Sequence, residues 1–262
     1  MNRQLLTFGL KARAVALLVF LALGLAPPVA WANASDTAPV RIAFVGDSMA
    51  DGLWGALFRR LGKDKCLADK VKLSRQAKNG TGLARLDHFN WVSEIGAMAS
   101  DAPTDLFVGS FGINDRQAII DAAKARIEYG APEFDSRYQA IAEDFMRNAT
   151  SHGASVMMLG LPVMLDPAAN ADARTKNRLF SAAVANIAPR RAVYVGPWSS
   201  RPGEDEYKPF LANANNVMMQ FRANDGVHFT QGGYDQVMDY LFPAIMDSLK
   251  LRGRDILSEC AK

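Results

Sequence analysis

Four short segments of the sequence carry the side chains that acyl transfer through a covalent serine requires. Ser48 offers a hydroxyl just behind a glycine, and His228 offers an imidazole that could act as its base. Asp225 comes three residues before His228, close enough for its carboxylate to orient the imidazole and stabilise its charged form. The backbone amides of Ser48 and Gly82 and the side-chain amide of Asn114 are the candidate donors to the oxyanion of a tetrahedral intermediate.

Each of these residues also has a common structural role. Ser48 with Asp51 fits a helix capping box, Gly82 fits a turn, and Asn114–Asp115 fits a plain strand-to-helix cap. A single histidine such as His228 is more often a packed or surface residue than a base. Taken singly, the structural roles are the commoner ones. Four independent caps that end in one serine, histidine and carboxylate set are not expected, so the joint pattern favours chemistry.

Apolar runs alternate with amphipathic helical patterns through most of the chain. The apolar runs predict strands at 40–46, 71–74, 106–111, 156–161 and 192–195. The helical patterns predict helices at 135–151, 171–187 and 234–249, and one that follows the first strand, in which Met49, Leu53, Leu57 and Leu61 recur every four residues. This alternation predicts a single α/β domain in which helices cover both faces of a parallel sheet, in three α/β/α layers.

The polar segments follow predicted strands, and this arrangement would bring them together. Ligands of parallel α/β sheets bind beyond the carboxyl ends of the strands. The segments of Ser48, Gly82 and Asn114 come after the first three predicted strands. Two stretches, 117–132 and 198–225, break the alternation and are predicted as loops that shape a pocket. Pro243 is expected to bend or shorten the last helix.

The N-terminal residues 1–34 read as a secretory signal peptide. An apolar run at 14–26 follows the basic residues Arg3, Lys11 and Arg13, and it is too short for the roughly 18 to 20 residues of a transmembrane helix. We therefore expect a periplasmic or secreted protein of residues 35–262, without stable membrane insertion. Those residues contain 27 basic and 27 acidic side chains, so bulk charge gives no reason to expect nucleic-acid binding.

Export sets the chemistry expected of the two cysteines, Cys66 and Cys260. In an oxidising compartment a disulfide that joins the end of the chain to its beginning is the favoured prediction, and two unpaired thiols are the alternative. The sequence has no CxxC motif, and its three histidines lie far apart in the sequence. We therefore predict no metal site and no cofactor.

The motifs together resemble the SGNH hydrolases, also called GDSL esterases. The blocks of that family stand here in order as Gly46-Asp47-Ser48, Gly82, Gly112–Asp115 and Asp225–His228. The resemblance spans nearly all of 40–262. The residues within the motifs are similar to those of a bacterial envelope subgroup of uncharacterised function. It implies a flavodoxin-like sheet, Ser48 as nucleophile, an oxyanion hole at Gly82 and Asn114, and Asp225 and His228 as the rest of a triad. Gly80 is an alternative oxyanion donor, although the subgroup wording favours Gly82.

These observations predict an exported serine esterase that cleaves small acyl esters. By analogy with the family, the expected substrate is an O-acetyl group on an envelope or extracellular glycan. The alternatives are an O-acyltransferase that acts on a glycan, a lipid esterase or lysophospholipase, and a non-catalytic glycan-binding accessory protein. Side chains that follow the motifs are candidate substrate contacts, with salt bridges and core packing as their alternative roles. They are Arg85, Trp91, Arg116 and Trp198.

Overall fold

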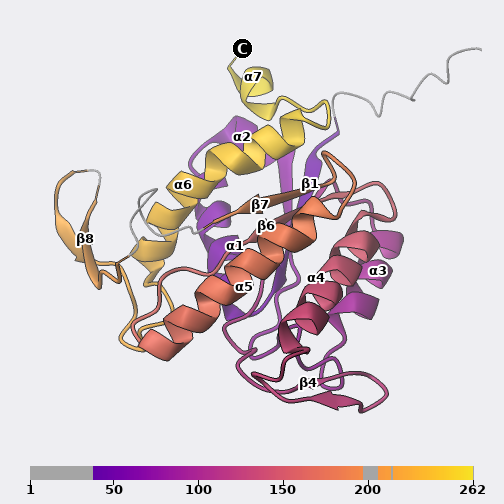
Figure 1. Ribbon diagram of the computed structural model, residues 1–262. Helices are drawn as coiled ribbons and strands as arrows, with labels where there is room; N and C mark the ends of the chain where they lie inside the picture. The colour runs from indigo at the N-terminus through magenta and orange to yellow at the C-terminus, as the bar shows by residue number, and fades with distance from the viewer. Residues whose placement is uncertain (1–37, 197–205, 214, 262) are drawn as a thin grey trace, which may run out of the picture. The chain divides into compact units, whose positions relative to one another are not determined.

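A five-stranded parallel sheet forms the centre of the structure, which is a computed structural model (Figure 1). The structure describes residues 38–196, 206–213 and 215–261, all within the unit Ser35–Lys262. The strands of the sheet are β1 (Val40–Gly46), β2 (Val71–Arg75), β3 (Leu106–Ser110), β6 (Ser155–Leu159) and β7 (Ala192–Val195). They are ordered β2, β1, β3, β6, β7, and every neighbouring pair is parallel. The predicted parallel sheet with flavodoxin-like order is thus confirmed.

Helices cover both faces of this sheet (Figure 1). On one face lie α1 (Ser48–Leu61) and α6 (Gln231–Lys250), and on the other lie α3 (Trp91–Asp101), α4 (Phe134–Thr150) and α5 (Pro167–Ala185). The alternation of side chains along β1 serves both layers, because successive residues of a strand point to opposite faces. Ile42 and Phe44 pack in the layer of α1 and α6, and Ala43 and Val45 pack in the other layer. The three-layer α/β/α architecture is confirmed.

The chain changes direction across the sheet at β1. From β1 it passes through α1 to the edge strand β2, then returns to β3 on the other side of β1. The carboxyl ends of β1 and β3 therefore form a topological switch point, where α/β sheets bind ligands. Gly46 lets these two ends approach each other. It has a φ of 127°, and a Cβ atom there would lie 1.9 Å from the Ser110 carbonyl oxygen.

The two predicted loops contain short hairpins, so the loop prediction is wrong in part. In 117–132, β4 (Ile119–Ile120) pairs antiparallel with β5 (Arg126–Ile127). The stretch 198–225 contains a second antiparallel pair, β8 (Phe210–Ala212) and β9 (Met218–Gln220), and residues 198–205 and 214 lie outside the described residues. Strands of two or three residues are too short to show an alternating pattern in the sequence.

Helix α6 is not shortened at Pro243, which lies inside it. A proline in a helix removes one backbone hydrogen bond and crowds the preceding turn. Here apolar residues on both sides of the proline hold the helix to the core. Leu241, Ile245 and Leu249 are each at most 1% exposed and pack against the sheet layer of α1. Burial of these side chains offsets the lost backbone hydrogen bond.

A disulfide joins the last helix to the start of the domain. Cys66 lies in α2 (Lys65–Lys70) and Cys260 ends α7 (Ile256–Cys260), and their Cα atoms are 5.7 Å apart. An ion pair between Lys70 and Glu259 lies beside the bond. The structure thus has the predicted pairing of the two cysteines. Among the helices of the described ranges, none combines the length and hydropathy needed to cross a bilayer.

Candidate active site

The three side chains proposed for a triad meet at the switch point. The Ser48 Oγ lies 2.7 Å from His228 Nε2, and His228 Nδ1 lies 2.7 Å from Asp225 Oδ2. The serine comes from the end of β1 and the other two residues come from the loop that precedes α6. The arrangement can transfer a proton from the serine hydroxyl to the imidazole, with the carboxylate fixing the orientation of the ring.

Ser48 is the first residue of α1 and does not cap it. The N-cap is Asp47, whose Oδ1 accepts a hydrogen bond from the Met49 amide at 2.9 Å. The alternative capping-box role of Ser48 with Asp51 is therefore wrong, since Asp51 binds Arg75 instead. Because Asp47 satisfies the helix end, the Ser48 hydroxyl is left to bond with His228. It also lies in the positive field of the helix N-terminus.

The Asp225 carboxylate organises the loop that carries His228. Its Oδ1 accepts hydrogen bonds from the backbone amides of Val227 and His228, each at 2.9 Å, while Oδ2 faces the imidazole. Partial burial acts to raise the pKa of Asp225, but the hydrogen bonds from His228 and the two amides outweigh it and lower the pKa to about 2. The carboxylate is therefore ionised near neutral pH, as a partner for a protonated imidazole must be.

The three candidate oxyanion donors have hydrogen-bonding capacity to spare. Asn114 Nδ2 donates to the Thr81 carbonyl at 2.9 Å, which leaves its second hydrogen available. The amides of Ser48 and Gly82 have no hydrogen-bond acceptor among the described residues. Gly80 has a φ of 77° and is exposed, and a Cβ atom there would meet nothing within 4 Å, so it acts as a turn residue. The geometry favours Gly82 over Gly80.

Asp115 ties the glycine segment to the end of β3, and sequence reasoning did not identify this role. Its buried carboxylate accepts hydrogen bonds from the amides of Leu83 and Ala84 at 2.9 and 3.0 Å and from the Tyr138 hydroxyl at 2.7 Å. A Cβ atom on Gly82 would lie 2.1 Å from this carboxylate. Only glycine therefore fits at this position, and the contact fixes the Gly82 amide beside Asn114. Charged hydrogen bonds of this kind are the stronger ones in proteins.

Arg222 is a second positioning residue that sequence reasoning missed. It is 2% exposed, and its guanidinium donates to the carbonyls of Val163 at 2.7 Å, Val227 at 2.6 Å and His228 at 3.3 Å. Burial lowers the pKa of Arg222 to about 10, so it stays charged near neutral pH. Through these bonds Arg222 links the loop of His228 to the loop that follows β6. The sequence does not distinguish Arg222 from a surface arginine, because its partners are backbone carbonyls, which are present at every residue and produce no sequence motif.

Comparison of sequences assigns the chain to a family. The family model described as "Protein of unknown function (DUF459)" matches residues 41–244, which is most of the chain. The chain belongs to the DUF459 family. Among curated proteins, none matches it in sequence.

Solved structures share the fold of this DUF459 protein. A carbohydrate esterase family 3 protein from Talaromyces cellulolyticus superposes with a TM-score of 0.55 at 12% identity, over 80% of this chain and 98% of that chain. For TesA the TM-score is 0.53 at 16% identity, over 79% and 99% of the two chains. A GDSL-like lipase from Bacteroides thetaiotaomicron gives 0.50 at 16% identity, over 79% and 88%. The fold expected from the resemblance, that of the SGNH or GDSL hydrolases, is confirmed.

Of the predicted substrate contacts, Trp91 is wrong. The DUF459 structure buries it completely, between Phe89 and Phe111, and its Nε1 donates to Thr81 Oγ1 at 2.9 Å. Trp91 therefore supports the glycine segment from behind and cannot touch a substrate. The sequence alone is compatible with a core position or a substrate-binding position for this tryptophan, because tertiary packing decides between the two. Trp198 lies outside the described residues.

The two arginines predicted to contact substrate are half-exposed and already paired. Arg85 forms a bidentate bond with Asp87, at 2.8 and 3.1 Å, and a longer bond with Gln117. Arg116 lies 3.4 Å from Asp166 and lines a small cavity beside Gly112. Contact of either arginine with a substrate remains a prediction.

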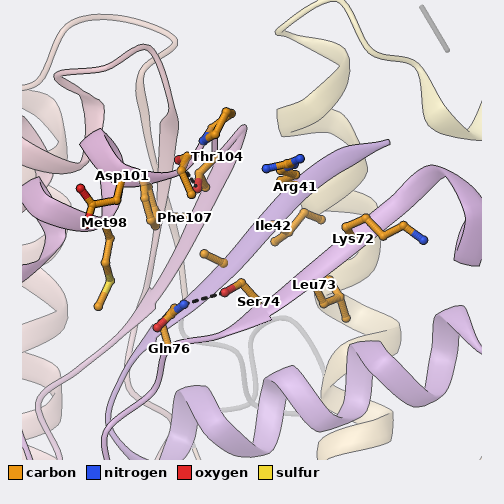
Figure 2. A pocket seen from close by; sticks show the side chains of 13 residues that line it. Arg41, Ile42, Lys72, Leu73, Ser74, Gln76, Met98, Asp101, Thr104 and Phe107 are labelled. Carbon is orange, nitrogen blue, oxygen red and sulfur yellow. Dashed lines mark hydrogen bonds between the residues drawn. The ribbon is translucent and has the colours of Figure 1, made fainter. Parts of the chain in front are cut away.

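A wider groove of about 440 Å³ lies away from the triad (Figure 2). Figure 2 shows Arg41 and Lys72 on neighbouring strands, with Met98 and Asp101 from the end of α3 across from them. None of the five candidate catalytic residues lines this groove. Within the described ranges, no three side chains of His, Cys, Asp or Glu are placed to hold a metal ion.

Asp47 is a buried acid directly beside the candidate nucleophile. It is 0% exposed, and its Oδ2 has no hydrogen-bond partner among the described residues. Burial, with a further contribution from nearby Asp115, raises the pKa of Asp47 from 3.8 to about 8. The folded protein therefore keeps the proton that the unfolded chain releases. The stabilising contribution of this group is fully present below about pH 4 and is lost as pH rises toward 8.

We expect Asp47→Asn to remove this pH dependence. Asparagine keeps the oxygen that accepts from the Met49 amide but cannot ionise. Between pH 5 and 8, the free energy of unfolding of the natural protein should fall relative to that of the variant, by up to about 1.4 kcal/mol per pH unit. Urea unfolding across this range measures the difference. Asp64→Asn, at the exposed N-cap of α2, is the matched control: it keeps Asp47, so its free energy of unfolding should fall with pH in parallel with that of the natural protein. Parallel pH profiles for Asp47→Asn and the natural protein would contradict the prediction.

Proposed function

We propose that this chain is a serine esterase that hydrolyses short acyl esters, O-acetyl esters foremost, on a glycan outside the cytoplasm. The observation that carries the proposal is the continuous chain of hydrogen bonds from Ser48 through His228 to Asp225, at 2.7 Å for each link. Three spare donors beside Ser48 and a fixed loop around His228 support it. The fold is shared with proteins whose titles name acetyl and carbohydrate esterases.

Acylation begins with the Ser48 hydroxyl. His228 Nε2 takes its proton as Oγ attacks the carbonyl carbon of the ester, and the Asp225 carboxylate stabilises the resulting imidazolium. The carbonyl oxygen becomes an oxyanion, which the amides of Ser48 and Gly82 and the side chain of Asn114 can stabilise. As the intermediate collapses, the bond to the alcohol breaks and the imidazolium returns the proton to the leaving alkoxide. The product is an acyl-serine. In the second half-reaction water attacks it, His228 takes the proton of that water, and the imidazolium then returns a proton to Ser48 Oγ as the acid leaves.

A small cavity, mostly apolar but also lined by Arg116 and Asp172, supports acetyl as the acyl group. It holds about 30 Å³ and borders both the Asn114 segment, through Ile113, and the His228 loop, through Val227. Leu161 and Met164 close it on the side of β6. A volume of this size admits about two water-sized groups, which suits a methyl and excludes a long acyl chain. A lipid esterase would need a longer apolar channel at this position.

The acyl group can be tested with aryl esters of increasing chain length. We expect kcat/KM for 4-nitrophenyl acetate to exceed that for the butyrate by at least about tenfold, since a chain that does not fit loses binding energy of a few kcal/mol. Met164→Ala should narrow this preference by enlarging the cavity. Met98→Ala, on α3 at the remote groove, makes the same change outside the cavity and should keep the natural preference. A natural protein that prefers the butyrate would refute the acetyl assignment.

The glycan and the compartment rest on separate support. Residues 1–34 have the pattern of a secretory signal, and an exported esterase meets the acetylated polysaccharides of the envelope or surroundings. The protein of similar fold from Talaromyces cellulolyticus is titled a carbohydrate esterase. An acetylated sugar is thus the proposed substrate class.

A further inference from the structure

A second cavity is lined by residues that lie close in sequence to two members of the triad, Ser48 and His228. This hollow, of about 370 Å³, lies between α1, the end of β2 and the start of α6. It begins at Asp51, one helical turn beyond Ser48, and includes Phe229, the residue after His228. Its lining continues along α1 to Arg59, a run of about 12 Å at 1.5 Å per residue. The length and volume suit one or two sugar rings.

The charges in the hollow are balanced. Arg75 binds Asp51 through two hydrogen bonds, at 2.5 and 2.8 Å, and Arg59 binds Asp235 through two, at 3.0 and 2.7 Å. Both arginines line the hollow, and each has its own carboxylate. An anionic ligand would have to compete with these carboxylates. An uncharged ligand that donates and accepts many hydrogen bonds suits such planar paired groups better.

The floor of the hollow is open because glycine lies beneath it. A Cβ atom at Gly55 would meet only the flexible end of Arg59, at 3.2 Å. Trp54 lines the same surface; its ring stacks with Phe58 at 5.5 Å, and the guanidinium carbon of Arg75 lies 5.3 Å from its centre. The Gln231 side chain at the start of α6 adds an exposed amide. Aromatic carbon beside paired polar groups offers surfaces for both the C–H and the O–H groups of a sugar.

The two cavities differ in the way that the two halves of an acetylated sugar differ. The first is small and mostly apolar, and its lining includes Ile113, next to Asn114 in sequence. The second is wide, has both polar and apolar walls, and is lined by Asp51, one helical turn beyond Ser48, and by Phe229, next to His228 in sequence. We infer that the hollow lined by Asp51, Trp54, Gly55, Arg75 and Gln231 binds the uncharged sugar that carries the ester, the alcohol half of the substrate. The inference rests on the proposed function, because the ester bond that the triad cleaves is what divides the substrate into an acyl half and an alcohol half.

Filling the hollow tests this assignment. In Gly55→Leu the new side chain would occupy the floor, so kcat/KM for mono-O-acetylated xylobiose should fall at least about tenfold relative to that for 4-nitrophenyl acetate, chiefly through KM. Ala97→Leu is the matched control: it places the same side chain at an exposed position of α3, outside the hollow, and the ratio there should equal the natural one. Arg75→Gln provides a second variant that breaks the polar wall without adding bulk, and it should lower the ratio too. An unchanged ratio in both hollow variants would overturn the inference.

Binding separates this inference from the proposed activity. Ser48→Ala protein titrated with mono-O-acetylated xylobiose cannot consume the ligand, and calorimetry should detect binding that Gly55→Leu, added to it, weakens at least about tenfold. Absence of binding, with 4-nitrophenyl acetate still hydrolysed by the natural protein, would remove the sugar site and leave the esterase. Binding that depends on Gly55, with no hydrolysis of any ester, would remove the esterase and leave the sugar site.

Discussion

Replacing Ser48 with alanine should reduce hydrolysis of 4-nitrophenyl acetate by about 10⁴-fold or more, to the level of the residual catalysis that an oxyanion hole and binding provide. The loss is expected because the Ser48 Oγ is the atom hydrogen-bonded to His228, at 2.7 Å, so no other hydroxyl can take its place. The fold should persist, since Asp47 and not Ser48 caps α1. Steady-state kinetics and the melting temperature measure the two effects.

The control for this substitution is Ser93→Ala, a serine exposed on α3. It should keep the natural rate. A serine-reactive fluorophosphonate should label the natural protein and the control at the peptide that contains Ser48, and it should not label Ser48→Ala. Full activity in Ser48→Ala would refute the assignment of Ser48 as the nucleophile. A natural protein that is inactive and unlabelled would refute the proposed esterase activity.

Removing the disulfide should give the largest change in stability. The bond between Cys66 and Cys260 spans 194 residues, and in the chain-entropy model a loop of that length stabilises the folded state by about 5 kcal/mol. Typical domains have only about 5 to 15 kcal/mol of stability in total. The double variant Cys66→Ser with Cys260→Ser should therefore unfold at much lower urea concentration. Its melting temperature should fall by roughly 10 °C.

Reductant provides the internal control for this experiment. It should destabilise the natural protein to the level of the double variant and leave the variant unchanged. The cysteines lie in α2 and α7, away from the triad, so the folded variant should retain its rate. Equal stability of the natural protein with and without reductant would contradict the prediction, as would two cysteines that alkylate freely before reduction.

The sequence was sufficient for the sheet and for the members of the site. The sequence predicted all five strands of the sheet to within two residues at each end. The central strands β3 and β6 are buried at every position, and such parallel strands are mostly apolar. Once those strands were parallel, motifs that followed Gly46 and Ser110 had to meet, since the carboxyl ends of neighbouring strands lie together. The order of the motifs along the chain then specified which side chains could react.

The supporting contacts could not be predicted in the same way. Asp115 holds amides 31 and 32 residues away, and Arg222 holds a carbonyl 59 residues away. Such partners depend on how loops pack, and they leave no periodic signal in the chain. The same holds for Trp91, whose indole faces the core and not the substrate. Its residue type was compatible with both positions, and only packing distinguished them.

The distance along the chain between nucleophile and base has a consequence for biosynthesis. Ser48 and His228 are 180 residues apart, so a ribosome that adds about 5 to 20 residues per second completes the base about 10 to 40 s after the serine. A partly made chain has a hydroxyl without a proton acceptor and cannot attack acylated metabolites around it. In the proposed esterase, reactivity would therefore arise only after the loop before α6 has folded against the end of β1.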